Sequence, residues 1–171
     1  MKEIIKGSVL LLASILLARF LLPANITPLV AVAVFMPFIT NSRHLQVWLP
    51  VGILFVTDLV LGFYGNTMFF VYGSMIAIGI LSRYTHRSTY TGLIKTSLMS
   101  VLLWHLVVNF GVYINNLGAV SLINTYALAI PFDFRLLVST LAFSSLFYGA
   151  NYLVNQYLHK QDSGSTPTTF A

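Results

Sequence analysis

The chain has 171 residues, of which 57% are hydrophobic and 8% are charged, and its mean hydropathy is +0.85. Soluble domains carry about a quarter charged residues, so this composition excludes an ordinary soluble domain and indicates an integral membrane protein of one domain. The absence of cysteine excludes disulfides and cysteine metal sites, and the net charge of +5 includes no basic cluster long enough to predict nucleic-acid binding.

The first predicted helix covers Ile4–Leu22. Its charged start and apolar run resemble a signal peptide, but no A-x-A-like cleavage site follows, so we predict a retained membrane helix. Ser14 and Ala18 are spaced four residues apart on it, which permits close helix packing. We therefore expect this helix to lie against another helix, either in this chain or in a partner protein such as a transporter energising module or a larger membrane complex.

Five further long apolar segments follow along the chain. The second segment begins after Thr27, a predicted N-cap, with Pro28 at the first helical position. The second and fourth are short for a full span, which needs roughly 17–25 residues, so we expect them to be kinked, extended by polar turns or buried among the other helices. The five segments are Pro28–Ile39, Leu45–Leu61, Met68–Leu81, Leu93–Ile114 and Leu136–Leu158.

A shorter apolar segment, Val120–Ile130, ends at Pro131 and is too short to span. The predicted fold is therefore all-α, a polytopic membrane protein with six transmembrane helices plus one short interfacial or re-entrant helix. Residues 1–160 are predicted to form a single domain, and the polar tail, residues 161–171, is predicted to be disordered.

The distribution of lysine and arginine predicts the orientation. With six spans and a cytoplasmic N-terminus, seven basic residues lie on the inner side and two, Arg19 and Arg135, on the outer side. Basic residues are enriched in cytoplasmic loops, so both termini are predicted to be cytoplasmic. The inner basic residues are Lys2, Lys6, Arg43, Arg83, Arg87, Lys95 and Lys160.

Asp58 stands near the predicted outer end of the third span, after an uncharged apolar run. A carboxylate there faces the negative end of the helix dipole and lies in or near hydrocarbon. These two unfavourable terms predict a compensating cation, with Arg19 as first choice and Arg135 as second. The alternative is that Asp58 is a helix-end residue that reaches water at the lipid headgroups.

His105, Asn109 and Tyr113 are spaced by four residues in the fifth span and share one helix face. Polar groups in lipid must point into the bundle and find partners there. Two interpretations are open, because such a stripe either lines a cavity or joins helices by hydrogen bonds. His105 without a second histidine or a carboxylate nearby in sequence does not predict a metal site.

Polar and aromatic residues gather at the predicted outer ends of the spans, which favours a site that opens outward. No nucleotide loop and no Ser-His-Asp pattern at one depth occurs in the sequence, so we expect neither an enzyme nor a bound cofactor. The predicted substrate-binding residues are Arg19, Asn25, Asp58, Tyr64, His105, Asn109 and Tyr113.

Four stretches of the chain together resemble a known family. They are NITPLVAVAVF (25–35), LPVGILFVTDLVLGFY (49–64), VVNFGVYINN (107–116) and YALAIPF (126–132). They resemble an uncharacterised family of small bacterial six-helix membrane proteins with the motifs N-[FI]-T-P, S/T-D-x-x-L-G-F, T/V-N-F-G-V and A-x-P-F. That family is in turn similar to the substrate-binding S-components of energy-coupling-factor transporters.

This resemblance implies a membrane component that binds a vitamin-like small molecule from the outer face and carries no ATPase of its own. The absence of cysteine counts against a cobalamin-binding cysteine, and Met1-Lys2 lacks the N-terminal histidine of nickel and cobalt S-components. The alternative function is a non-catalytic structural subunit of a larger membrane complex, in which Asp58 and Asn109 only hold the bundle together. An outward cavity favours the first function, and a packed interior favours the second.

Overall fold

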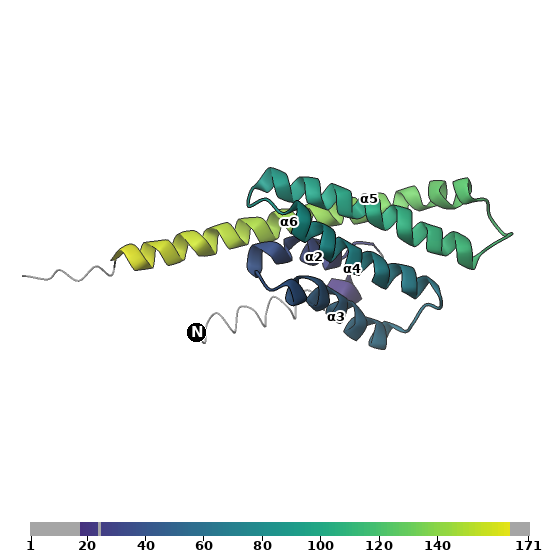
Figure 1. Ribbon diagram of the computed structural model, residues 1–171, viewed down its shortest axis with the longest axis horizontal. Coiled ribbons are helices and arrows are strands. Elements are labelled where there is room, and N and C mark those ends of the chain that lie inside the picture. The colour runs from purple at the N-terminus through teal and green to yellow at the C-terminus, as the bar shows by residue number, and fades with distance from the viewer. Residues whose placement is uncertain (1–17, 24, 165–171) are drawn as a thin grey trace, which may run out of the picture.

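The computed structural model of the chain describes residues 18–23 and 25–164. The described residues form helices joined by short turns, with no strand among them, which confirms the all-α fold class. The helices run alternately up and down a bundle (Figure 1). They are α2 (Leu29–Ile39), α3 (Arg43–Leu61), α4 (Thr67–Thr85), α5 (Tyr90–Asn115) and α6 (Leu122–Gly164), preceded by residues 18–21, the described end of the first predicted helix.

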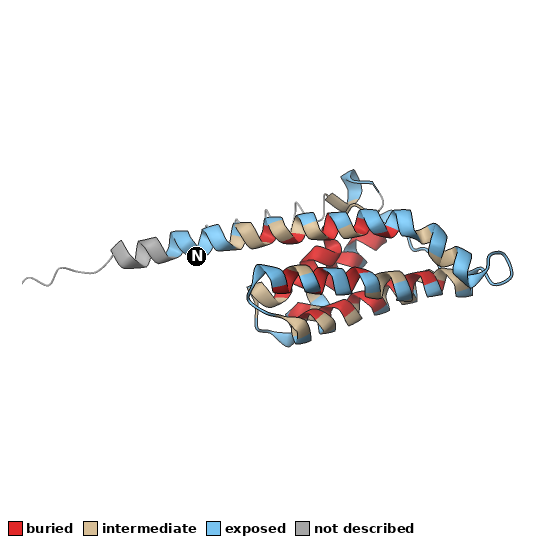
Figure 2. Cartoon of the chain, turned by 90° about the horizontal axis from the view of Figure 1, so that it is seen from above, coloured by how far each residue is buried: buried red, intermediate tan, exposed pale blue. Residues whose placement is uncertain are grey.

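The exposed surface of this bundle is unlike that of a soluble domain. Large apolar side chains such as Val60, Phe69 and Leu102 are exposed, whereas Ser74, Ser97 and other small polar residues are buried (Figure 2). An apolar exterior needs an apolar solvent, and hydroxyl groups in a bilayer are satisfied inside the bundle. α3, α4, α5 and α6 are each long and apolar enough to cross a membrane, so the chain is a polytopic membrane protein.

α2 is the short helix at the centre of the bundle. It has 11 residues, and the run from Leu29 to Met36 is buried throughout. The helix contacts α3, α4, α5 and α6, so its short apolar length is shielded by neighbouring helices rather than by lipid. The Thr27 hydroxyl accepts a hydrogen bond from the Leu29 amide at 3.1 Å, as an N-cap does, although the helix begins one residue later than the sequence indicates.

α6 differs from its predicted form. The short segment Val120–Ile130 and the sixth predicted span belong to one continuous helix of 43 residues, with Pro131 inside it. A proline removes one backbone hydrogen bond, but helices in membranes tolerate this loss where neighbouring groups satisfy the freed carbonyl. At 1.5 Å per residue α6 is about 65 Å long, and its C-terminal part projects beyond the other helices (Figures 1 and 2). The helix includes residues 161–164 of the predicted tail, and residues 165–171 lie outside the described part.

Close helix contacts depend on small residues. Gly111 of α5 packs against the Phe70 ring of α4 so tightly that a Cβ at this position would overlap the ring. Between α5 and α6, the buried Ser97 hydroxyl donates to Ser144 at 3.3 Å. Small residues let helix backbones approach, and their hydroxyls supply hydrogen bonds inside the apolar bundle.

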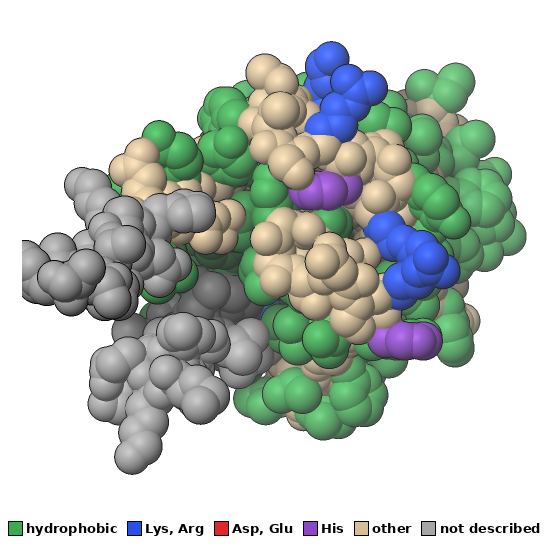
Figure 3. All heavy atoms as spheres, turned by 60° about the vertical axis from the view of Figure 1, so that its left-hand side comes forward, with side chains coloured by type: hydrophobic (Ala, Val, Ile, Leu, Met, Phe, Trp, Pro, Cys, Tyr) green, Lys and Arg blue, Asp and Glu red, His purple; other side chains and the backbone are tan. Residues whose placement is uncertain are grey.

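The two ends of the bundle differ in charge. The start of α3, the end of α4, the following turn and the start of α5 meet at one end, which we call the basic end and which carries Arg43, Arg83, Arg87 and Lys95. Figure 3 shows basic and histidine side chains on the face seen from this side and no acidic side chain among the described residues visible there. The opposite end contains the turn between α3 and α4 and the turn between α5 and α6.

Candidate functional site

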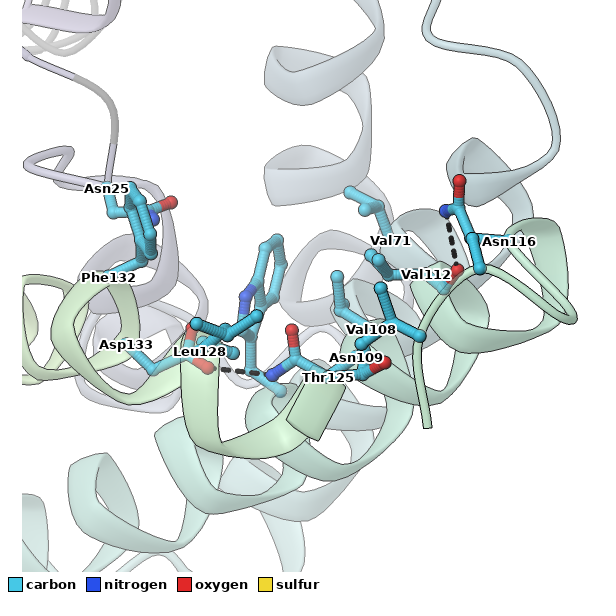
Figure 4. Close-up of a pocket in the computed structure, with 14 residues that line it drawn as sticks. Asn25, Val71, Val108, Asn109, Val112, Asn116, Thr125, Leu128, Phe132 and Asp133 are labelled. Atoms are coloured by element: carbon cyan, nitrogen blue, oxygen red, sulfur yellow. Dashed lines mark hydrogen bonds between the residues drawn. The ribbon is translucent and has the colours of Figure 1, made fainter. Parts of the chain in front are cut away.

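A cavity of about 500 Å³ opens near the end of the bundle opposite the basic end. The turn before α2, the first part of α4, the second half of α5, the turn after it and the first half of α6 all contribute to its wall (Figure 4). Most of the lining is apolar, with a few amide, hydroxyl and carboxylate groups. The lining residues are Asn25, Val71, Trp104, Val108, Asn109, Val112, Asn116, Ala119, Val120, Thr125, Leu128, Ala129, Phe132 and Asp133.

Asp133 of α6 and Asn109 of α5 meet at the cavity wall. The Asn109 side-chain amide donates to Asp133 Oδ2 at 2.8 Å (Figure 4). His105 Nδ1 lies 2.7 Å from the same carboxylate oxygen. Asn109 and Asp133 are both buried, with exposed fractions of 8% and 9%. These contacts join α5 to α6 and fix the direction of the carboxylate.

The Asn109 amide also decides the tautomer of His105. Its two N–H groups donate to the His105 carbonyl at 2.8 Å and to Asp133. The contact of 3.1 Å between Asn109 Nδ2 and His105 Nδ1 then has no hydrogen left to share, so with Asp133 ionised the hydrogen between His105 Nδ1 and Asp133 Oδ2 belongs to Nδ1, which donates it. The Tyr126 ring meets the His105 ring edge-on at 5.3 Å and helps to hold it.

Asn25 reaches the cavity from the turn before α2. Its φ of 65° is in the left-handed region, and it is the only described residue other than glycine with a positive φ. Asparagine adopts this conformation more readily than most residues. In the close-up Asn25 and Phe132 lie together on one side of the cavity, away from Val112 and Asn116 (Figure 4).

A second polar cluster surrounds Asp58, which is only 1% exposed. Arg19 donates to Asp58 Oδ1 at 2.6 Å, and this ion pair confirms the partner predicted from the sequence. The hydroxyls of Tyr64 and Tyr72 donate to Oδ2 at 3.1 and 2.9 Å. Both carboxylate oxygens are therefore satisfied, and Asp58 lines neither described cavity.

Tyr64 lies in the turn between α3 and α4, outside the spanning helices. Burial raises the pKa of the Tyr64 hydroxyl, and the negative charge of Asp58 and the hydrogen bond to it raise it further. The neutral phenol is therefore the form that the cluster stabilises.

The predicted site residues separate into two groups in space. Asn25 and Asn109 line the cavity, and His105 contacts Asp133 beside it. Tyr113 is not among the lining residues, and its ring lies 6.5 Å from that of Phe110. Arg19, Asp58 and Tyr64 belong to the second cluster. Arg135, the second-choice partner of Asp58, is exposed on α6.

Sequence reasoning did not assign Asp133, Trp104 or Thr125 to the site. The signal for Asp133 was its place in an apolar run, where a carboxylate needs a partner just as Asp58 does. The sequence predicts that one helix ends at Pro131 and the next begins at Leu136, which leaves Asp133 between two helices rather than opposite Asn109. Tyr72 was also missed as a partner of Asp58, since one hydroxyl in an apolar helix gives no distinctive pattern.

A second, smaller cavity of about 350 Å³ lies at the basic end, between the end of α2 and α6, and is lined by Phe38, His86 and several asparagines. Partial burial lowers the pKa of His86. Within the described part of the chain, no three His, Asp or Glu residues lie close enough to hold a metal ion.

The fold and the cavity define a small polytopic α-helical membrane protein with a mostly apolar cavity between its helices, in which a few polar groups and two aromatic rings contribute to the wall. The chain belongs to a family of unknown function, DUF6580, which it matches over residues 2–162. No curated protein and no solved structure matches the chain.

Proposed function

We propose that this chain is the substrate-binding membrane component of a small-molecule uptake transporter. The cavity of about 500 Å³ carries the proposal. Ligand pockets usually measure roughly 300–1,000 Å³ and combine apolar walls with a few convergent polar groups. Asn25, Asn109 and Asp133 supply the polar groups, while Trp104 and Phe132 supply aromatic surface.

The cost of such a space supports a ligand. Side chains that line a cavity make fewer dispersion contacts with other side chains than those of a packed bundle. A purely structural subunit of a larger complex gains nothing from the loss of these dispersion contacts. A bound small molecule restores the contacts and gives the polar groups of the wall their partners.

The resemblance in general architecture between the family suggested by the sequence motifs and the S-components of energy-coupling-factor transporters agrees with this proposal. In that arrangement the chain lies in the bacterial inner membrane, and the cavity opens to the outside. No nucleotide-binding motif occurs in the sequence, so the chain takes its energy from a separate module or acts alone. Its own task is binding rather than catalysis.

One observation favours the second candidate, a structural subunit of a membrane complex. Asp133 joins α5 to α6, and Asp58 joins the end of the first helix to α4 through Arg19 and Tyr72. Polar contacts between helices of this kind hold bundles together without any ligand. This function predicts a partner protein in place of a small molecule.

A cavity-filling variant separates the two functions. Val112→Phe puts a ring into the cavity, whereas Val138→Phe makes the same change at an exposed position of α6. Native mass spectrometry after extraction in mild detergent should detect a bound small molecule in the wild type and in Val138→Phe, and none in Val112→Phe. If both variants retain the small molecule equally, the cavity is not its binding site. Recovery of a stoichiometric membrane protein without any small molecule would favour the structural subunit.

The outward opening of the cavity is tested by labelling. The chain contains no cysteine, so single cysteines are unambiguous reporters. With cytoplasmic termini, an impermeant thiol reagent applied to intact cells should label Asn66→Cys in the turn between α3 and α4, and should not label Ser163→Cys. The reverse pattern would invert the topology and direct the cavity to the cytoplasm.

A further inference from the structure

We propose that the cavity selects a small organic cation, an amine or quaternary ammonium group attached to an apolar body. This inference rests on the proposed function and names the class of its substrate. Asp133 is the only charged side chain among the lining residues that the structure describes, and no lysine or arginine is present to neutralise it. A charged cavity wall with one sign attracts the opposite sign.

The hydrogen bonds of Asp133 leave part of the carboxylate available. His105 and Asn109 both donate to Oδ2, and no described residue donates to Oδ1. Oδ1 is not one of the buried polar atoms without a hydrogen-bond partner. This is the result expected for an oxygen without a partner that is exposed to the cavity. An oxygen held in a fixed direction beside a cavity is placed to accept a hydrogen bond from an ammonium group or to face a quaternary one.

The aromatic lining fits the same class of ligand. Trp104 and Phe132 both border the cavity, and the faces of tryptophan and phenylalanine rings attract cations. The amides of Asn25 and Asn116 add neutral acceptors. An anionic ligand would instead face a carboxylate whose only nearby basic group is the titratable His105 ring, with no lysine or arginine among the described lining residues, which is unfavourable in a poorly solvated site.

The charge preference of the cavity can be measured before any natural ligand is known. Ala129 lines the cavity one helical turn before Asp133 on α6, so the side chains of these two positions are neighbours. In detergent micelles, the thiol of Ala129→Cys would be allowed to react with a trimethylammonium-ethyl and, separately, a sulfonatoethyl methanethiosulfonate. Asn66→Cys, exposed in the turn between α3 and α4, is the reference thiol.

We expect the ratio of cationic to anionic reaction rates to be at least about tenfold higher at position 129 than at position 66, because a carboxylate close to the thiol acts at low effective dielectric constant. Asp133→Asn should reduce the difference toward none, and Asp133→Glu should retain most of it. If Asp133→Asn does not fold, the comparison of positions 129 and 66 in the otherwise unchanged chain still decides the matter.

Two results would overturn the inference, and they differ in what else they exclude. Equal rate ratios at both positions would remove the cation preference and leave an accessible binding cavity, so the proposed function would stand. Failure of both reagents to reach Ala129→Cys, while Asn66→Cys reacts, would show a cavity closed to solutes and would remove the proposed function as well.

Discussion

Asp58 and Asp133 are two buried carboxylates with opposite surroundings. Asp58 is 1% exposed and is bound by an arginine and two tyrosine hydroxyls, which occupy both of its oxygens. Asp133 is 9% exposed, has a histidine and an amide on a single oxygen, and borders the cavity. The first carboxylate is saturated by the protein, and the second has acceptor capacity to spare.

The difference shows how an intramembrane carboxylate can serve two purposes in one small bundle. A fixed guanidinium that cannot lose its proton neutralises Asp58, so this cluster has a structural role. The partners of Asp133 are groups that direct the carboxylate without fully occupying it. Exposure differs little between the two, so the arrangement of partners rather than burial distinguishes them.

The largest expected effect comes from breaking the ion pair of Asp58. Asp58→Asn or Arg19→Gln alone should lower the free energy of unfolding by about 3–5 kcal/mol, because each leaves a buried group without its partner. The double variant should be destabilised by less than the sum of the two single variants. Thermal unfolding in detergent measures all three.

Arg135→Gln is the matched control for this pair, since Arg135 is exposed and should change stability by less than about 0.5 kcal/mol. Additive effects of Asp58→Asn and Arg19→Gln would contradict the pairing and with it one side of the comparison.

Asp133→Asn should have an intermediate effect, about 1–3 kcal/mol, since an asparagine oxygen can still accept one of the hydrogen bonds that now reach Oδ2. The same melting experiment measures it beside Asp58→Asn. Retention of the small molecule should follow the reverse order. Asp133→Asn should reduce it more than Asp58→Asn does, although Asp133→Asn lowers stability less. If Asp133→Asn proves as destabilising as Asp58→Asn, both carboxylates are structural and the distinction between them fails.

The smallest expected effect concerns Tyr64. Its raised pKa keeps the phenol protonated in the folded protein at pH values where the unfolded chain ionises, so its contribution is complete below about pH 10 and decreases as the pH rises beyond that. The melting temperature of Tyr64→Phe should therefore fall less steeply than that of the wild type between about pH 9 and pH 11.

Tyr84→Phe, at a 78% exposed position, is the control for this change. If the melting temperature of Tyr64→Phe falls with pH as steeply as that of the wild type, the Tyr64 hydroxyl contributes nothing to the stabilisation of Asp58.

The helices were largely predictable because hydropathy determines which segments enter a bilayer. The predicted segments at 45–61 and 93–114 correspond to Arg43–Leu61 and Tyr90–Asn115. The extra residues are polar ones at the helix ends, such as Tyr90, which follows the N-cap Thr89. Hydropathy does not register such residues, because capping rather than apolar burial adds them to the helix.

The Asp58 pair was predictable and the Asp133 pair was not, for one physical reason. A cation was required near Asp58, and only two basic residues, Arg19 and Arg135, were predicted at that end, so the choice was narrowed to two candidates with Arg19 as the first. Asp133 is satisfied by neutral or titratable partners, His105 and Asn109, which many other residues could have replaced. The cavity itself depends on how several separate parts of the chain pack around it, and no pattern in the sequence records that packing.

The buried position of α2 has a consequence for how the chain enters the membrane during synthesis. Its 11 residues extend about 16 Å, roughly half of the hydrocarbon thickness, so α2 cannot cross a bilayer by itself. Among the described helices it contacts α3, α4, α5 and α6, all of which are synthesised after it. We therefore expect α2 to become stably integrated only when these later helices assemble around it, which makes the second segment to leave the ribosome among the last to be secured in the membrane.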